Sequence, residues 1–274
     1  MVIFTIFNYI AKELLNYTSK SKEYMAITLD EERNKAQQLV DYNIYNIPIS
    51  DFFKSAFSVD CVVYGFDGTD FKVLLIQRGA EPYKGQFALP GDLVYPNEDL
   101  STSANRVLQE LTGLSDVYLQ QHRTFGAVDR HPLGRVITIS HFALVNIEHY
   151  NPTSSSWAQN AHWHSMKDLP RLAFDHEIIL REATLELRKR VRVQPIGFEL
   201  LPVKFSLNQL QLLYEAILDK TFDKANFRKK ILSMKFLEEL DEREQNVNHR
   251  PARLYRFNPD IYASLKKEGF SFEL

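Results

Sequence analysis

The hydrophobic positions of this chain first form a regular pattern near residue 58, and that pattern is typical of β-structure. Residues 59–66 are mostly apolar, residues 71–76 are apolar except for one lysine, and Asp67-Gly68 separates the two runs. An Asp-Gly pair between two such runs favours a tight turn, because glycine adopts a left-handed backbone at no steric cost. The pattern therefore predicts a β-hairpin over residues 59–76.

Helical spacing follows in residues 101–112. Four apolar side chains recur there three and four positions apart, namely Ala104, Val107, Leu108 and Leu111. Gly113 comes next, where a glycine commonly ends a helix. We expect Val107 and Leu111 to face the core. Strands at 125–128 and 135–145 and an amphipathic helix at 176–191 complete the pattern of an α/β sandwich.

The chain becomes helical again after a connector that contains two prolines. Ser206 precedes an apolar stripe over residues 207–218, as the N-cap of a helix would. A second helix is predicted at 223–234, followed by a charged loop and a strand at 252–257. Helix, turn, helix and β-wing is the order of a winged helix-turn-helix.

Composition narrows the class of protein. The 274 residues suggest about two domains, and 45% apolar with 25% charged residues is typical of a globular chain. A net charge of -2 excludes a protein that coats polyanions along its whole surface, but it leaves room for a local basic patch. The single cysteine, Cys61, excludes an internal disulfide and a zinc site of several thiolates. We therefore expect a cytoplasmic protein.

Three parts follow from these patterns: an N-terminal extension of unassigned role at residues 1–50, an α/β domain at 56–194, and a winged helix domain at 195–274. The extension contains a helix-like stretch at 29–40, and Met25 within it is a candidate start of translation. Within its first 15 residues, Asn8 interrupts an apolar run, and the first cation, Lys12, follows that run instead of preceding it. We expect neither a signal peptide nor a membrane partner.

A motif in the α/β domain resembles the Nudix box, Gly-x5-Glu-x7-Arg-Glu-U-x-Glu-Glu-x-Gly-U with U a bulky aliphatic residue. The matching residues are Gly91, Glu98, Arg106, Glu110 and Gly113, and the interval from Glu98 to Arg106 is that of the family. The resemblance covers about residues 56–175 and implies a Nudix-like α/β/α sandwich.

The sequence differs from the Nudix box at positions where the family has the glutamates that bind the metal. Val107 and Leu111 stand where the family has glutamates, and one extra residue separates Gly91 from Glu98. Nudix hydrolysis needs several carboxylates on the helix, because Mg²⁺ takes oxygen ligands in octahedral geometry. With Glu110 alone on the helix, we expect a binding role with no catalytic residue, no metal and no cofactor, and Mg²⁺ only if hydrolase activity is retained.

Residues 125–130 and 135–138, together with the basic C-terminal helix, resemble Nudix-related transcriptional regulators of the NrtR and AraR type. The resemblance implies a small effector, ADP-ribose in some members and a pentose in others, that weakens DNA binding. The degenerate box is closer to the sugar-sensing members. Candidate effector-binding residues are Arg78, Gln86, Glu110, Asp129, Arg130, Asp175 and His176, although residues 129–132 also fit an ordinary turn.

Residues 224–235 hold five Lys or Arg side chains and no acid, a local charge of +5. Such a run is often only a solvated helix face, but its place as the second helix before a wing favours a recognition helix. Cations there would neutralise phosphates, and Asn226 could bind an adenine edge. The candidate DNA-binding residues are Lys224, Asn226, Arg228, Lys229, Lys230 and Ser233 of the helix, with His249, Arg250 and Arg253 of the wing.

The sequence thus predicts a ligand-responsive transcriptional regulator that binds a palindromic double-stranded operator as a homodimer. Two alternatives remain open. One is a Nudix hydrolase acting on a nucleoside diphosphate derivative such as ADP-ribose, with Glu98 and Glu110 recruiting Mg²⁺. The other is a protein-binding adaptor in which the basic helix is incidental.

Overall fold

The computed structural model describes residues 54–274 except 116, 150–151, 153–157 and 246–249. The N-terminal extension, with its helix-like stretch and Met25, lies outside the described residues, as does His249 of the wing. Residues 56–274 form one compact unit. None of the helices in the described part is long and apolar enough to cross a membrane.

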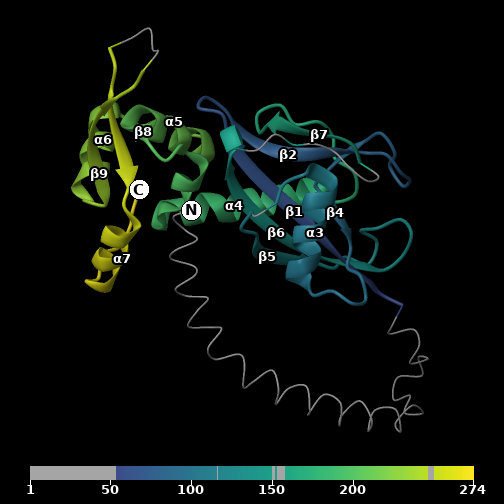
Figure 1. Ribbon diagram of the computed structural model, residues 1–274. Helices are drawn as coiled ribbons and strands as arrows, with labels where there is room; N and C mark the ends of the chain where they lie inside the picture. The colour runs from purple at the N-terminus through teal and green to yellow at the C-terminus, as the bar shows by residue number, and fades with distance from the viewer. Residues whose placement is uncertain (1–53, 116, 150–151, 153–157, 246–249) are drawn as a thin grey trace. The chain divides into compact units, whose positions relative to one another are not determined.

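A mixed sheet forms the centre of the α/β domain (Figure 1). Its strands are β1 (Ala56–Phe66), β2 (Phe71–Arg78), β3 (Phe87–Ala88), β4 (Gly91–Leu93), β5 (Gln120–Phe125), β6 (Val136–Asn146) and β7 (Ala158–Ser165). The main path runs β3-β2-β1-β6-β5, with β4 beside β1 and β7 beside β2. The pairing of β1 with β6 is parallel, and the other strand pairs are antiparallel. A short 3-10 turn, η1 (Ile147–His149), follows β6.

Two helices cover the two faces of this sheet, α3 (Leu100–Thr112) on one side and α4 (His176–Val193) on the other. Alternate residues of β1 separate accordingly: Val59 and Val63 join the cluster around α3, while Val62 and Tyr64 join the cluster around α4. These layers confirm the predicted Nudix-like α/β/α sandwich.

The predicted helix in the Nudix box is confirmed as α3. Val107 and Leu111 are buried, and Gly113 ends the helix with φ of 72°. The strand expected at 125–128 is wrong, because β5 ends at Phe125 and the chain continues as a loop. β5 is polar and largely exposed, so it offers no apolar alternation that would locate it.

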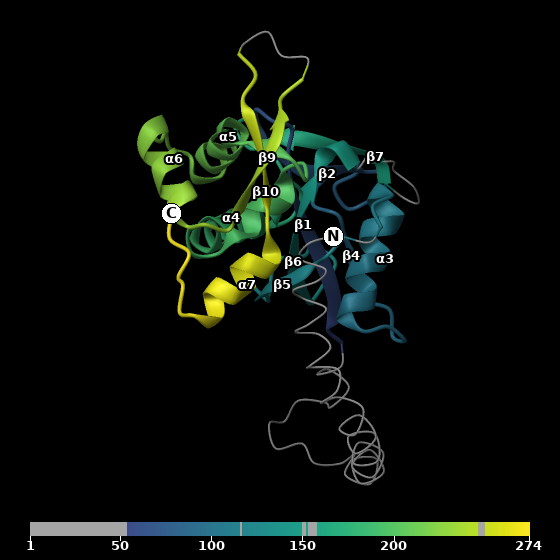
Figure 2. The ribbon, with the colours of Figure 1, turned by 60° about the vertical axis from the view of Figure 1, so that its left-hand side comes forward.

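The C-terminal part is the predicted winged helix, which lies toward the viewer in Figure 2. Its elements are η2 (Pro195–Leu200), β8 (Phe205–Ser206), α5 (Leu207–Leu218), α6 (Lys224–Ser233), β9 (Leu237–Arg243), β10 (Arg253–Phe257) and α7 (Pro259–Lys267). Ser206 begins α5 through a reciprocal capping box with Gln209. The wing strands and β8 form a small sheet in the order β8-β10-β9.

The charged loop expected after the second helix is wrong over its first half, where β9 forms. Five of the seven residues of β9 are charged, and none is fully buried, so the period of two is invisible in the sequence. Pairing with β10 through Tyr255 and Phe257 holds this polar strand in place. Helix α7 was not predicted, and it buries none of its residues fully.

Candidate functional site

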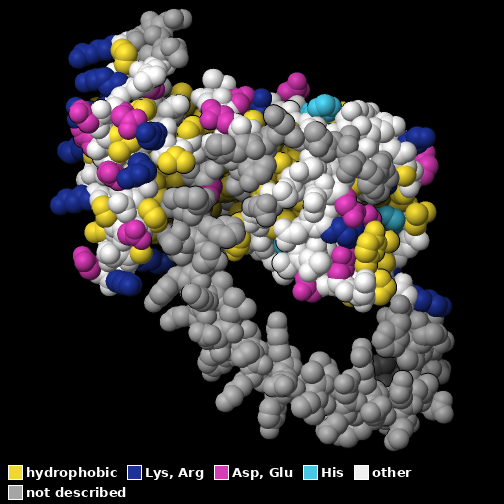
Figure 3. Space-filling view, viewed as in Figure 1, with side chains coloured by type: hydrophobic (Ala, Val, Ile, Leu, Met, Phe, Trp, Pro, Cys, Tyr) yellow, Lys and Arg dark blue, Asp and Glu magenta, His cyan; other side chains and the backbone are white. Residues whose placement is uncertain are grey.

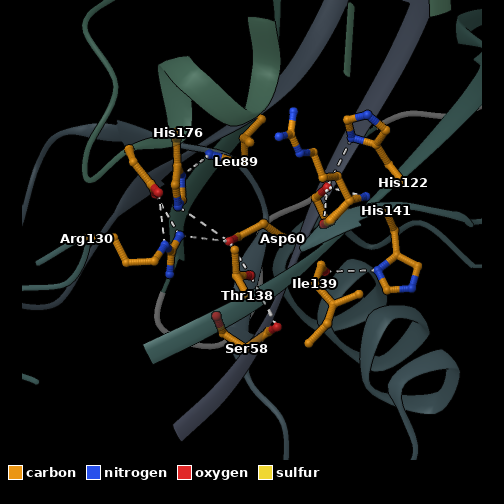
Figure 4. Close-up of polar contacts among 12 residues, drawn as sticks. Ser58, Asp60, Leu89, His122, Arg130, Thr138, Ile139, His141 and His176 are labelled. Carbon is orange, nitrogen blue, oxygen red and sulfur yellow. Dashed lines mark hydrogen bonds and ion pairs between the residues drawn. The ribbon is translucent and has the colours of Figure 1, made fainter. Parts of the chain in front are cut away.

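Four charged or polar side chains meet near one end of the central sheet, and we call Asp60, Arg130, Asp175 and His176 the buried charge cluster (Figure 4). Asp60 lies on β1, Arg130 in the loop after β5, and Asp175 and His176 at the start of α4. Parallel pairing of β1 with β6 brings Thr138 beside Asp60 as well. The cluster therefore joins three segments that are far apart in the sequence.

Arg130 is the centre of this cluster. Its Nε and Nη2 donate to the two carboxylate oxygens of Asp175 over 2.9 and 2.6 Å, and Nη2 lies 3.6 Å from Oδ2 of Asp60. Thr138 Oγ1 donates to the same Asp60 oxygen over 2.6 Å. The Arg130 side chain is only 4% exposed. Charges so deeply buried need good partners, because removing one partner leaves an uncompensated charge in a medium of low dielectric.

His176 completes the cluster as a neutral ring. Its Nδ1 accepts the backbone N–H of Leu89 over 3.0 Å, and its Nε2 lies 3.4 Å from Oδ1 of Asp60. Burial lowers the pKa of His176, although the nearby Asp60 and Asp175 act in the opposite direction. A proton on Nδ1 would also break the bond from Leu89, so the ring stays neutral with its single proton on Nε2.

Gly91 of the Nudix box supports this cluster by its lack of a side chain. A Cβ at this position would overlap Oδ1 of Asp60 and touch the carbonyl oxygen of Val59. The glycine is therefore required by the close pairing of β4 with β1.

Aromatic rings line the neighbouring side of the site. The Phe174 ring stacks on His131 at 5.0 Å and lies 4.8 Å from the Arg78 guanidinium, and Tyr83 meets its edge at 4.8 Å. Phe174 and Tyr83 adopt φ of 54° and 63°, a left-handed backbone that costs non-glycine residues on the order of 1–3 kcal/mol. We call Arg78, Tyr83, His131 and Phe174 the aromatic wall.

The predicted effector-binding residues divide into two groups. Arg130, Asp175 and His176 come together in the buried charge cluster, and Arg78 joins the adjoining aromatic wall. Gln86 and Asp129 are instead exposed, and Glu110 lies on α3 against Arg106. The structure does not bring Gln86, Asp129 and Glu110 into the cluster, because the loops turn the first two toward solvent and α3 lies on the other face of the sheet.

Sequence reasoning missed Asp60 and Thr138, which are both buried. The signal for Asp60 was its position as the only acid in an apolar strand, since a lone buried carboxylate needs a partner. For Thr138 the sequence carries no such signal, because threonine is common in strands.

The two glutamates of the Nudix box are both engaged by Arg106. Arg106 donates to both oxygens of Glu98, over 2.9 and 2.6 Å, and its Nη1 lies 3.3 Å from Glu110. These hydrogen bonds lower the pKa of Glu98 to about 2. The Tyr95 ring covers the guanidinium at 3.8 Å. Among the described residues, no three His, Cys, Asp or Glu side chains form a group that could hold a metal ion, and both carboxylates of this box are already bound to Arg106.

Helix α6 has the two faces that the sequence predicts. Phe227 and Ile231 are buried, as is Met234 at the C-cap, whereas Lys224, Asn226, Lys229, Lys230 and Ser233 are exposed. Asp223 caps the helix by accepting the N–H of Asn226 over 2.9 Å. Arg228 differs from the other candidates, because it is half-buried and its Nε is buried without a hydrogen-bond partner. Basic side chains project from this part of the molecule in Figure 3.

The wing is less basic than the sequence suggests. Residues 237–245 contain five acids and one arginine. Cations of the small sheet pair with these acids: Arg253 with Glu239, Arg256 with Glu238 at 2.7 Å, and Lys204 with Glu242 at 2.7 Å. Arg250 is exposed at the tip. The candidate Arg253 therefore already has an acidic partner, and the exposed face of α6 is the more cationic surface.

Comparison with known domain families agrees with this architecture. Residues 54–185 match the model of the NUDIX domain, and residues 197–257 match the NrtR DNA-binding winged helix domain. The first match contains the central sheet and the first part of α4, and the second contains α5, α6 and the wing.

Three similar proteins cover much of the chain. The "ADPR responsive transcriptional repressor NtrR" of Acinetobacter baylyi is 34% identical over 212 residues, which are 76% of this chain and 84% of that protein. The ADP-ribose pyrophosphatase of Methanocaldococcus jannaschii is 32% identical over 54% of this chain and 80% of that protein. The crystal structure of Shewanella oneidensis NrtR with a 27mer DNA is 26% identical, with a TM-score of 0.66, and covers 79% of this chain and 97% of that one.

The chain belongs to the NrtR family of transcriptional regulators, in which a NUDIX domain precedes a DNA-binding winged helix domain.

Proposed function

We propose that this protein is a transcriptional repressor whose NUDIX domain binds ADP-ribose and whose winged helix then releases its operator. The observation that carries the proposal is the pairing of Arg130 and Asp175 next to the aromatic wall. Two curated relatives, a repressor and a pyrophosphatase, both have ADP-ribose in their names, which supports the same ligand.

The chemistry of the site favours ADP-ribose over a pentose. A guanidinium that binds a carboxylate through two parallel hydrogen bonds presents the same fork to a phosphate. A diphosphate could therefore take the place of Asp175 on Arg130, with Arg78 as a second cation. The rings of Tyr83, His131 and Phe174 offer surfaces on which a purine can stack. A free pentose has neither an anionic group nor an aromatic base for these partners.

The exposed face of α6 supports the second half of the proposal. Four of its side chains, Lys224, Asn226, Lys229 and Lys230, are exposed on a helix whose other face is buried in the domain. Cations so placed can bind phosphates, and Asn226 can bind a base edge in the major groove. We further propose a homodimer in the cytoplasm, because a single winged helix reads only one half of a palindromic operator.

Fluorescence anisotropy with the full chain and a labelled duplex from upstream of its own gene tests this function. We expect binding that salt weakens and that ADP-ribose reverses, whereas L-arabinose and other pentoses leave it unchanged. If a pentose releases the DNA and ADP-ribose does not, the effector is a pentose and the ADP-ribose proposal is wrong. Absence of any DNA binding at low salt would refute the regulator and favour a protein-binding adaptor.

Hydrolysis of ADP-ribose is a second candidate, favoured by the similarity to the Methanocaldococcus pyrophosphatase. Incubating the protein with ADP-ribose and Mg²⁺ or Mn²⁺ tests it through release of AMP and ribose 5-phosphate. The matched control is Glu110→Gln, which removes the charge of the one glutamate on the box helix. Because Arg106 engages both Glu98 and Glu110, we expect no difference between the two proteins.

A further inference from the structure

We propose that helix α4 couples the buried charge cluster to the winged helix, and that Arg188 is the positioning residue through which it does so. The inference rests on the proposed function, since it explains how an effector in the NUDIX domain would reach α5 and α6. It is carried by a series of contacts along α4 (His176–Val193).

The first part of α4 is fixed to β1 at two points. At its first residue, His176 Nε2 lies 3.4 Å from Oδ1 of Asp60. Two turns later, Thr184 Oγ1 and the Tyr64 hydroxyl form a buried hydrogen bond of 2.8 Å. The helix rises about 12 Å over this interval, and β1 advances about 13 Å from Asp60 to Tyr64. Both contacts therefore hold only while α4 keeps its axial position along β1.

The far part of α4 holds the end of α5. Arg188, one turn beyond Thr184, donates from Nε to the backbone carbonyl of Ile217 over 2.7 Å. Ile217 lies in the last turn of α5, where carbonyl groups have no partner within the helix. A guanidinium there also interacts favourably with the helix dipole. A side chain of α4, the helix that packs on the central sheet, thus caps the C-terminal end of α5, the first helix of the helix-turn-helix.

Apolar packing joins the same elements. Ile179 and Leu187 of α4 belong to the same buried cluster as Leu210 and Leu213 of α5 and Phe227 of α6. A tightly packed core of this kind transmits small displacements, because it cannot deform continuously.

The effector would act on the first turn of α4. Asp175 is the N-cap residue of this helix, and its carboxylate is bound to Arg130 instead of to the helix N–H groups. A diphosphate that displaces Asp175 from Arg130 frees that carboxylate and changes how the helix is held against β1. Because α4 is one continuous helix, a shift at its first turn reaches Arg188 and hence the carbonyl of Ile217.

The test measures the ratio of the operator Kd with saturating ADP-ribose to the Kd without it, in the full-length protein. Coupling of this kind is commonly about 5- to 150-fold. For Arg188→Ala we expect a ratio below about 3-fold, while operator affinity without effector and calorimetric affinity for ADP-ribose each stay within about 3-fold of wild type. Arg188→Lys keeps a charged donor and should restore part of the ratio. Arg181→Ala is the matched control, since Arg181 lies on the same helix, is 67% exposed and pairs with the adjacent Glu182.

A wild-type ratio in Arg188→Ala would overturn the inference. If that variant does not fold, Tyr64→Phe takes its place in the test, because it removes only the hydroxyl that contacts Thr184. A wild-type Kd ratio in Tyr64→Phe would also overturn the inference. Should wild type bind DNA but ignore ADP-ribose, the proposed effector fails and the coupling is tested separately. Arg130→Lys and Arg188→Ala are then combined, and strict additivity of their effects on operator affinity overturns the inference whereas non-additivity supports it.

Discussion

Arg130 and Asp175 form a two-point ion pair that joins the loop after β5 to the N-cap of α4. The pair lies 45 residues apart in the sequence and is almost completely buried on the arginine side. Buried pairs of this kind contribute little net stability, because the loss of hydration offsets the Coulomb attraction. The proposed role of this pair in effector binding therefore predicts an effect on ligand affinity that is separate from its effect on stability.

Arg130→Lys should therefore weaken ADP-ribose binding more than it weakens the fold. Lysine keeps the positive charge beside Asp60 and Asp175 but loses the planar fork. Loss of one hydrogen bond to a charged group costs about 1.5–3 kcal/mol, which is about a 10- to 150-fold rise in Kd by calorimetry. Arg123→Lys, at an exposed ion pair with Glu182, is the control. An unchanged Kd in Arg130→Lys would remove this residue from the effector site.

Two residues of α6 are expected to contribute differently to DNA binding. Lys229→Ala should weaken binding to operator and random duplexes alike and reduce the slope of log Kd against log salt by about 1. Asn226→Ala should cost about 1–3 kcal/mol on the operator and little on random DNA. Lys267→Ala, an exposed cation on α7, controls for net charge. Identical behaviour of the two α6 variants on both duplexes would contradict these assignments.

The acidic wing makes an unusual prediction: removing an acid should tighten DNA binding. Glu239→Gln frees Arg253 from its ion pair, so one more cation can contact a phosphate. We expect higher affinity and a salt slope steeper by about 1, with little change in Tm because exposed pairs contribute little. Glu148→Gln changes net charge equally on an exposed residue of the NUDIX domain. If both variants raise affinity equally, the effect is one of net charge and Arg253 has no part in it.

The elements that sequence periodicity predicts are those with one apolar face. The hairpin of β1 and β2, and the helices α3 to α6, all bury such a face, and each lies close to its expected bounds. β5 and β9 are polar on both sides, and only pairing with a neighbouring strand reveals them. Local pattern cannot report such long-range pairing.

The site was predictable only in part for the same reason. Arg130, Asp175 and His176 were identified because they lie near the sheet ends or in loops that flank the cleft in the family that the sequence resembles. Asp60 joins them through the parallel pairing of β1 with β6 and the packing of α4 on β1, and both relationships depend on the whole fold. Gln86 and Asp129 lie outside the buried charge cluster, since proximity in sequence to the site does not turn a loop side chain inward.

His176 should make the stability of the protein depend on pH. Burial lowers the pKa of His176 in the folded state, whereas in the unfolded chain it titrates near 6.5. The unfolded state therefore binds more protons below about pH 6.5, so the free energy of unfolding falls as pH decreases from there toward the lowered pKa. This histidine can contribute at most about 1.4 kcal/mol per pH unit.

His176→Asn should flatten that slope, because the asparagine amide does not titrate and its oxygen can still accept the N–H of Leu89. Urea unfolding between pH 7.5 and 5.5 measures the slope independently of any overall loss of stability. Asn160→Ala, at an exposed position on β7, changes no titratable group and should keep the wild-type slope. Other buried or partly buried histidines, including His141, also have lowered pKa values, so part of the dependence will remain. A wild-type slope in His176→Asn would mean that His176 has the same pKa in the folded and the unfolded chain, and that burial in the charge cluster does not lower it.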